Sequence, residues 1–187
     1  MSRLRAVELS KSYRLLNHGP TVLVSSAAGE RSNVMAAAWA MPLDFDPPKV
    51  LVVIDKATHT RELIEASGEF VLNIPCRAQA AAVLRAGGAD GRLVDKFAYS
   101  GLSRRLAQKV AAPRVDGCIA YLECKVISEP HNQQRYDLFI GEVVAAEADE
   151  EVFGDGRWHF DDEAKRSLHY IAGGAFFATG EAFEVEK

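Results

Sequence analysis

The sequence predicts a mainly β fold of the α+β class, in which an antiparallel sheet curls into a barrel. Short apolar runs rich in β-branched residues come mostly in neighbouring pairs, and only short helix-prone stretches are inserted between them. A doubly wound parallel sheet would instead alternate strands with helices along the chain. No internal repeat or linker-like segment divides the sequence, so residues 1–187 are predicted to form a single domain.

The first two expected strands form a hairpin. Thr21–Ser25 is strand-like, residues 28–32 have the glycine and polar side chains of a turn, and Asn33–Trp39 resumes with small apolar residues. The prolines at 42, 47 and 48 bracket a connection. After them, Lys49–Asp55 is an almost uninterrupted apolar run, which predicts a central strand buried on both faces.

Two helices with one strand between them are expected after this run. Thr58–Ser67 has helical spacing, with Thr58 or Thr60 as the N-terminal cap and Gly68 as the terminator. Glu69–Pro75 is strand-like. Arg77–Ala86 is alanine-rich and predicts a helix that ends at a glycine pair, followed by a mobile loop over residues 87–91.

The last expected pair of strands is also a hairpin. Ile119–Ser128 alternates between apolar and polar residues, and Tyr136–Ala146 forms a further strand. The polar segment between them, residues 129–134, predicts a turn. Strands that come in neighbouring pairs favour an antiparallel sheet curled into a barrel.

Composition narrows the range of functions. Twenty-two Lys and Arg against 26 Asp and Glu give a net charge of -4, which argues against a nucleic-acid binder because such proteins carry a basic excess. No apolar run approaches the roughly 18 residues that span a bilayer, and no signal-peptide core follows the basic N-terminus. A cytoplasmic protein with no membrane partner is therefore expected. Three cysteines without a Cys-x-x-Cys pair are interpreted as reduced, buried thiols: Cys76, Cys118 and Cys124.

Several common catalytic chemistries leave no trace in the sequence. It contains no Gly-x-Gly-x-x-Gly, Walker-type Gly-Lys-Ser/Thr, Gly-x-Ser-x-Gly or His-Glu-x-x-His motif. A Rossmann dehydrogenase, a P-loop nucleotidase, a common serine hydrolase and a zincin therefore lose support. His159 lies near Asp161 and Asp162, but one histidine beside loop carboxylates is typical of a surface cluster, and no metal is assigned.

The segment Asp55–Arg61 carries the residue types of a phosphate site. Hydroxyls, a cation and free backbone N–H groups gather where a buried strand ends and a helix begins. In the alternative interpretation, Thr58 and Thr60 only cap the helix while Lys56 and Arg61 point into water. His59 faces either the phosphate or the solvent, and as a lone histidine it is interpreted as a bystander.

Two further segments bear on the choice between a phosphate site and a simple helix cap. Asn33–Trp39 is unusually rich in small residues, which would let a flat ligand approach the backbone closely, although such strands also occur in tightly packed barrels. Asp95–Phe97 adds a cation, Lys96, beside an aromatic residue. Lys96 is also consistent with a surface position on an amphipathic turn.

Five segments in this order resemble a known family. They are Ser32–Ala36, Lys56–Thr60, Glu69–Pro75, Asp95–Phe97 and Phe139–Val143. In sequence and spacing they are similar to the flavin reductase-like, FMN-binding split-barrel family, of which flavoredoxin is a member. The similarity runs from about Tyr13 to Val144.

The resemblance implies a six-stranded Greek-key split barrel, a homodimer, and one FMN near each dimer interface. By position, four residues would line the isoalloxazine ring, largely through backbone groups: Asn33, Val34, Met35 and Ala36. Three would meet the phosphate or ribityl chain: Lys56, Thr58 and Thr60. Asn73 and Lys96 match family positions near the same site.

The implied function is FMN-dependent oxidoreduction, with hydride passing from NADH or NADPH through FMN to free flavin, a partner monooxygenase or another redox protein. The alternative is an FMN-binding electron carrier or sensor without NAD(P)H turnover of its own. No acid–base pair is required, because the flavin carries the hydride chemistry. His169 or Tyr170, in the aromatic C-terminal segment, would border the nicotinamide or substrate pocket, with His169 as the only candidate catalytic residue.

Overall fold

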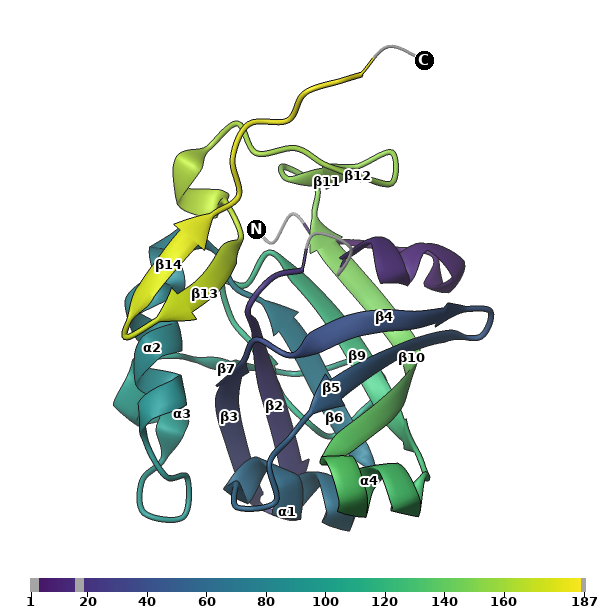
Figure 1. Cartoon of the computed structure of the whole chain (residues 1–187), viewed down its shortest axis with the longest axis vertical. Helices are drawn as coiled ribbons and strands as arrows, with labels where there is room; N and C mark the ends of the chain where they lie inside the picture. The colour runs from purple at the N-terminus through teal and green to yellow at the C-terminus, as the bar shows by residue number, and fades with distance from the viewer. Residues whose placement is uncertain (1–3, 16–18, 186–187) are drawn as a thin grey trace.

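The main sheet curls around one core, and its two edge strands are not paired with each other (Figure 1). The computed structural model describes residues 4–15 and 19–185, and within them the main sheet has eight strands in the order β3-β2-β6-β9-β10-β5-β4, with β1 beside β10. Neighbouring strands are antiparallel throughout this sheet. The strands are β1 Leu4–Ala6, β2 Val22–Ala28, β3 Arg31–Ala37, β4 Ala40–Phe45, β5 Pro48–Val53, β6 Glu69–Ile74, β9 Ala120–Ile127 and β10 Leu138–Asp149.

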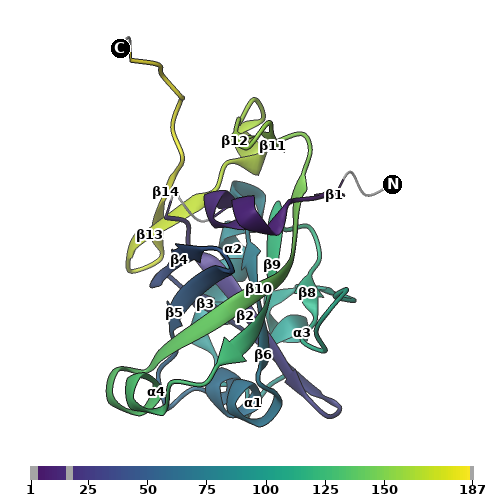
Figure 2. The same ribbon diagram turned by 90° about the vertical axis from the view of Figure 1, so that its right-hand side faces the viewer.

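Helices cover one side and one end of this sheet. In both views α1 and α4 lie at the same end of the barrel (Figures 1 and 2), and Figure 1 shows α2 and α3 beside β3. The helices are η1 Leu9–Leu15, α1 His59–Ser67, η2 Arg77–Gln79, α2 Ala80–Gly88, α3 Lys96–Ser100, α4 Pro130–Tyr136 and η3 Glu163–Lys165. Three small two-stranded sheets complete the fold: β7 Arg104–Arg105 with β8 Arg114–Val115, β11 Phe153–Gly154 with β12 Arg157–Trp158, and β13 Leu168–Ala172 with β14 Ala175–Ala178.

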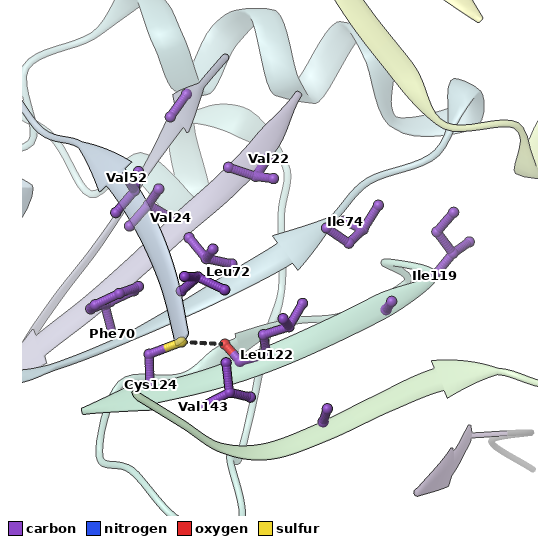
Figure 3. Packing of buried hydrophobic residues seen from close by; sticks show 14 of the residues in the cluster. Val22, Val24, Val52, Phe70, Leu72, Ile74, Ile119, Leu122, Cys124 and Val143 are labelled. Carbon is purple, nitrogen blue, oxygen red and sulfur yellow. Dashed lines mark hydrogen bonds between the residues drawn. The ribbon is translucent and has the colours of Figure 1, made fainter. Parts of the chain in front are cut away.

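Two strands separate two apolar clusters. Val22 and Val24 of β2 point into the barrel, where they join Phe70, Leu72 and other residues of β6, β9 and β10 (Figure 3). The intervening Leu23 packs on the opposite face against residues of α2 and α3. Side chains alternate along a strand, so β2 and β6 are apolar on both faces. This explains why the sequences of these two strands are continuously hydrophobic.

All six expected strands are present, and the predicted antiparallel, mainly β class is confirmed. The helix after residue 58 is also confirmed: Thr58 caps α1 and Gly68 ends it with a positive φ of 71°. The alanine-rich segment forms η2 and then α2, which includes the glycine pair in its last turn. The three cysteines are buried thiols, as expected.

Three expectations were wrong. The proline-bracketed connection is largely a strand, β4, because Pro42 lies in an edge strand where a missing N–H is tolerated. The run Lys49–Asp55 is not buried on both faces, since β5 alternates between buried and half-buried residues. The polar turn 129–134 is the helix α4, which begins with Pro130 in its first turn and ends at Asp137 in the left-handed region.

No helix in the described part of the chain is long and apolar enough to cross a membrane. The same residues contain no group of three or more histidine, cysteine or carboxylate side chains placed to hold a metal ion.

Candidate functional site

Two adjoining cavities lie along the outer edge of β3. The larger has a volume of about 700 Å³ and the smaller about 330 Å³. Met35 and Ala36 of β3 line both cavities, and so do Gly87 and Gly88 at the end of α2. Because four residues are shared, the two cavities form one continuous site with two compartments.

The small side chains of β3 open this site to the backbone. β3 ends the main sheet, so only β2 pairs with it among the described strands. Backbone N–H and C=O groups on the other edge of such a strand are available to a ligand. Ala36 and Ala37 keep the approach to that edge clear, and a Cβ added at Gly87 would lie 3.6 Å from the Cβ of Ala36. A flat ligand can therefore lie against the strand.

The N-terminus of α1 borders the smaller cavity. The Thr58 hydroxyl accepts a hydrogen bond from the Arg61 backbone N–H (3.3 Å) and donates one to the carbonyl of Asp55 (2.8 Å). Thr58 is thus the N-cap, and the first turn of the nine-residue helix presents backbone N–H groups and the positive end of its dipole. This end of the cavity favours an anion.

Two buried polar side chains join β3 to α1. The Asn33 Nδ2 donates to the hydroxyl of Thr60 over 2.9 Å, and Thr60 is fully buried. The Asn33 Oδ1 is buried without a partner among the described residues. A Cβ at Gly91 would collide with the Asn33 amide, so only glycine lets the loop before α3 approach this closely.

A buried lysine completes the smaller cavity. Lys96 opens α3, where the carboxylate of Asp95 caps the helix by accepting from the N–H groups of Phe97 and Ala98. Lys96 is only 5% exposed, and no described residue offers it a hydrogen bond or an ion pair. Burial lowers the pKa of its amine, and the negative charge of Asp90 opposes this shift in part.

A hydrogen-bonded row of three side chains flanks the same cavity. The Nδ1 of His59 lies 2.7 Å from a carboxylate oxygen of Glu62, and the other oxygen of Glu62 lies 2.6 Å from Nη2 of Arg92. The hydrogen bond from Arg92, followed by that from His59, lowers the pKa of the Glu62 carboxyl. Glu62 is therefore ionised at neutral pH.

The larger cavity is mainly apolar and partly aromatic. Trp39 follows β3, and Val83 and Leu84 come from α2. Tyr170 and Phe176 come from the hairpin β13–β14 and pack edge to face with their centroids 5.5 Å apart. This hairpin is tied to the barrel because the backbone N–H of Tyr170 donates to the hydroxyl of Thr21 (2.9 Å). Apolar walls of this kind suit a flat ring system.

The structure brings most of the sequence-predicted site residues together. Six of them line the smaller cavity: Asn33, Met35, Ala36, Thr58, Thr60 and Lys96. Lys56 is exposed and lines neither cavity, and Val34 packs inside the second apolar cluster. His169 also lies outside both linings, and its neighbour Tyr170 lines the larger cavity instead.

Asn73 lies away from both cavities, on the outer face of β6. Its Nδ2 is within hydrogen-bond distance of the Leu23 and Val71 carbonyls and the Ser25 hydroxyl, and its Oδ1 accepts from the N–H of Val115 at 2.7 Å. Both ends of the amide are used within the protein. The structure thus gives Asn73 a role in joining β2, β6 and β8.

Sequence reasoning missed the wall formed by α2 and Trp39. The glycine pair that it interpreted as a loop lies in the wall shared by the two cavities, and the pair itself was the available signal. Phe176 both packs on Tyr170 and lines the larger cavity. No local signal connects this hairpin with β3.

Residues 14–173 match the profile of the flavin reductase like domain. The chain belongs to the flavin reductase-like family. An FMN-binding domain of a flavin reductases-like enzyme from Shewanella baltica OS155 is 52% identical, with a TM-score of 0.96, over 99% of this chain and 98% of that one. Flavoredoxin of Desulfovibrio vulgaris (Miyazaki F) is 30% identical, with a TM-score of 0.78, over 89% and 90%.

A further relative of this flavin reductase-like chain is the uncharacterized protein YddH of Escherichia coli K12. It is 44% identical over 184 residues, which is 97% of either chain. The family and the split-barrel fold expected from the five sequence segments are thereby confirmed.

Proposed function

We propose that this chain binds FMN across the two cavities and acts as an FMN-dependent oxidoreductase that accepts hydride from NADH or NADPH. Reducing equivalents then pass to free flavin or to a partner acceptor such as a monooxygenase. The observation that carries the proposal is Lys96, a buried cation without a partner among the described residues, at a cavity that also receives the N-terminus of α1. An unpaired buried charge is costly, and a phosphate group would offset that cost.

The residues present fit FMN at both of its ends. Lys96, Thr58, Thr60 and the first turn of α1 would hold the phosphate in the smaller cavity. The open edge of β3 and the apolar walls of the larger cavity would receive the flat isoalloxazine ring. The wall shared by the two cavities would lie beside the ribityl chain that connects the two ends.

FMN, when bound, supplies the hydride and electron transfer, so the protein needs no acid–base pair. The residues of this chain bind and orient the cofactor. Val83, Trp39 and Phe176 supply apolar walls to the larger cavity, and backbone N–H groups of β3 would stabilise negative charge on the ring's polar edge.

A homodimer is part of the proposal. Alternate residues along β4 and just before it are large, apolar and 44% to 73% exposed: Trp39, Met41, Leu43 and Phe45. Such a row on an edge strand favours burial against another chain. Because Trp39 also lines the larger cavity, a second copy seated on this row would close the cavity from the outside.

The second candidate function is that of an electron carrier without NAD(P)H turnover. The 30% identity with flavoredoxin over most of the chain favours it. This candidate uses the same FMN site and the same residues. It differs only in the source of the electrons, which would be another protein.

Two measurements test the proposal in sequence. Titration of FMN into flavin-free protein should change the flavin fluorescence and saturate at one FMN per chain. Rapid anaerobic mixing of the loaded protein with NADH, and separately with NADPH, should bleach the flavin absorbance. Absence of FMN binding would overturn the proposal, whereas binding without bleaching by either nucleotide would favour the electron carrier.

A further inference from the structure

The phosphate site proposed above leaves one buried group without a role. His59 is 8% exposed and lines the smaller cavity. Its Nδ1 is hydrogen bonded to Glu62 over 2.7 Å, and no described residue bonds to Nε2. A carboxylate on one ring nitrogen fixes the orientation of an imidazole and leaves the other nitrogen for a ligand. The position of His59 is therefore not that of a solvent-facing bystander.

Glu62 is itself held in place from outside the helix. Nε and Nη2 of Arg92 both donate to Oε1 of Glu62, over 3.0 and 2.6 Å, while Nη1 of Arg92 donates to the carbonyl of Ala57 (2.9 Å). A guanidinium that bonds a carboxylate through two nitrogens has little freedom to rotate. Arg92 thus fixes Glu62, and Glu62 fixes His59.

Arg92 also belongs to the segment that covers the cavity. We call residues 89–95, between α2 and α3, the strap. Ala89, Asp90 and Gly91 of the strap line the smaller cavity, and Gly91 packs directly on the Asn33 amide. The bonds from Arg92 to Glu62 and Ala57 tie this strap to the start of α1. One ion pair therefore both positions His59 and holds the strap against the cavity.

We propose that His59 is a further ligand of the FMN phosphate, oriented by Glu62, and that the Arg92–Glu62 pair fastens the strap over the bound phosphate. This inference rests on the proposed function. An imidazole can bond to Glu62 through one ring nitrogen and to a phosphate oxygen through the other. Glu62 and Arg92 are positioning residues, and His59 is a binding residue.

The proposal predicts discrimination between two flavins. Riboflavin has the same ring and ribityl chain as FMN but no phosphate. If His59 contacts the phosphate, its loss weakens FMN binding and leaves riboflavin binding unchanged. If the three side chains only support the fold of the cavity, their loss weakens binding of both flavins alike.

The experiment compares FMN and riboflavin affinities, measured by flavin fluorescence, for the unaltered chain, His59→Gln and Glu62→Gln. We expect the FMN dissociation constant of His59→Gln to rise about tenfold, because a charge-assisted hydrogen bond is lost. Glu62→Gln should show a smaller loss in the same direction. The matched control is Glu65→Gln, since Glu65 is paired with Arg61 on the same helix but lines neither cavity.

Each outcome decides the question. Loss confined to FMN supports the proposal, whereas equal losses for both flavins, or no loss in either variant, overturn it. The side chain of Glu62 is half exposed, so Glu62→Gln keeps its fold, and circular dichroism of each variant checks this. If the unaltered chain does not bind FMN, the proposed function fails with the inference; if it binds FMN and the variants match it, only the inference fails.

Discussion

Asn33 of β3 and Thr60 of α1 are joined by a buried hydrogen bond of 2.9 Å from the side-chain amide to the hydroxyl. The two residues come from elements that are 27 positions apart in the sequence, and both line the smaller cavity. This bond fixes the N-terminus of α1 against the edge strand. The geometry of the cavity therefore depends on a contact between side chains that also face its interior.

Replacing Thr60 by valine tests this dependence. Thr60→Val keeps the shape of the side chain but removes the acceptor of the Asn33 amide, so the free energy of unfolding should fall by about 1–3 kcal/mol. Urea denaturation followed by circular dichroism measures the change. Thr60→Ser retains a hydroxyl and should lose less; equal losses in the two variants would show that the hydrogen bond is not the cause.

Replacing Lys96 by methionine should separate binding from stability. Lys96→Met removes a buried, unpaired cation, so the flavin-free chain should be as stable as the unaltered one or more stable. FMN affinity should fall at least about tenfold, because the phosphate loses an ion pair. Thermal unfolding with and without FMN measures both effects. A variant that binds FMN as well as the unaltered chain would exclude Lys96 from the phosphate site.

The lowered pKa of Lys96 predicts a pH dependence. In the flavin-free chain this pKa lies below the usual 10.5 because of burial, and a bound phosphate would raise it. FMN affinity should therefore be steady below the lowered pKa and decrease as the pH rises through it, where the amine loses its charge. Titrations of FMN at increasing alkaline pH measure this. There are two controls: riboflavin, which lacks the phosphate, and Lys96→Met, which lacks the amine. Without an ion pair between amine and phosphate, neither should show this loss of affinity with pH.

The same linkage sets the sign for stability. The unfolded chain keeps the proton of Lys96 up to about 10.5, whereas the folded flavin-free chain releases it at lower pH. Between these two values the unfolded state binds more protons, so the contribution of Lys96 to the free energy of unfolding increases with pH.

The exposed row on β4 predicts the oligomeric state. Sedimentation should show a dimer for the unaltered chain and a shift to monomer for Met41→Glu, because a charge in the middle of an apolar interface is costly. Leu106→Glu is the matched control, since Leu106 is 91% exposed and lies outside β4. A monomeric unaltered chain would contradict the proposed dimer.

Asn73 should behave in the opposite way to Lys96. Asn73→Ala removes the acceptor of the Val115 backbone N–H and a donor to two strand carbonyls, so the free energy of unfolding should fall by about 2 kcal/mol or more. FMN affinity of the folded variant should stay within about twofold, since a substitution away from both cavities leaves the contacts with FMN intact. Urea denaturation and FMN titration on one preparation measure both; a selective loss of affinity would return Asn73 to the ligand site.

The regular elements could be predicted where apolar periodicity was strong. β2, β5, β6, β9 and β10 each carry such a run, and α1 has both a capping threonine and a terminating glycine. β4 escaped prediction because Pro42 and its exposed apolar residues resemble a connection. α4 escaped because its side chains are polar around the helix and only Pro130 marks its start.

The site could be predicted only where its residues lie close together in the sequence. Thr58 and Thr60 share one turn, and the small residues of β3 form one run. Asn73 was misleading because an asparagine within an apolar strand looks the same whether it meets a ligand or a neighbouring backbone. Arg92 and Phe176 reach the site through loops and a hairpin far along the chain, so tertiary structure alone reveals them.

The hairpin β13–β14 pairs with itself and not with the main sheet. Its side chains form a wall of the larger cavity, yet its two strands are paired with each other and with no barrel strand that the structure describes. Evolution can therefore alter what the cavity admits without disturbing the strands that shape its opposite wall. Exchanging this short segment between relatives that share the barrel is therefore expected to change which ligands the larger cavity accepts.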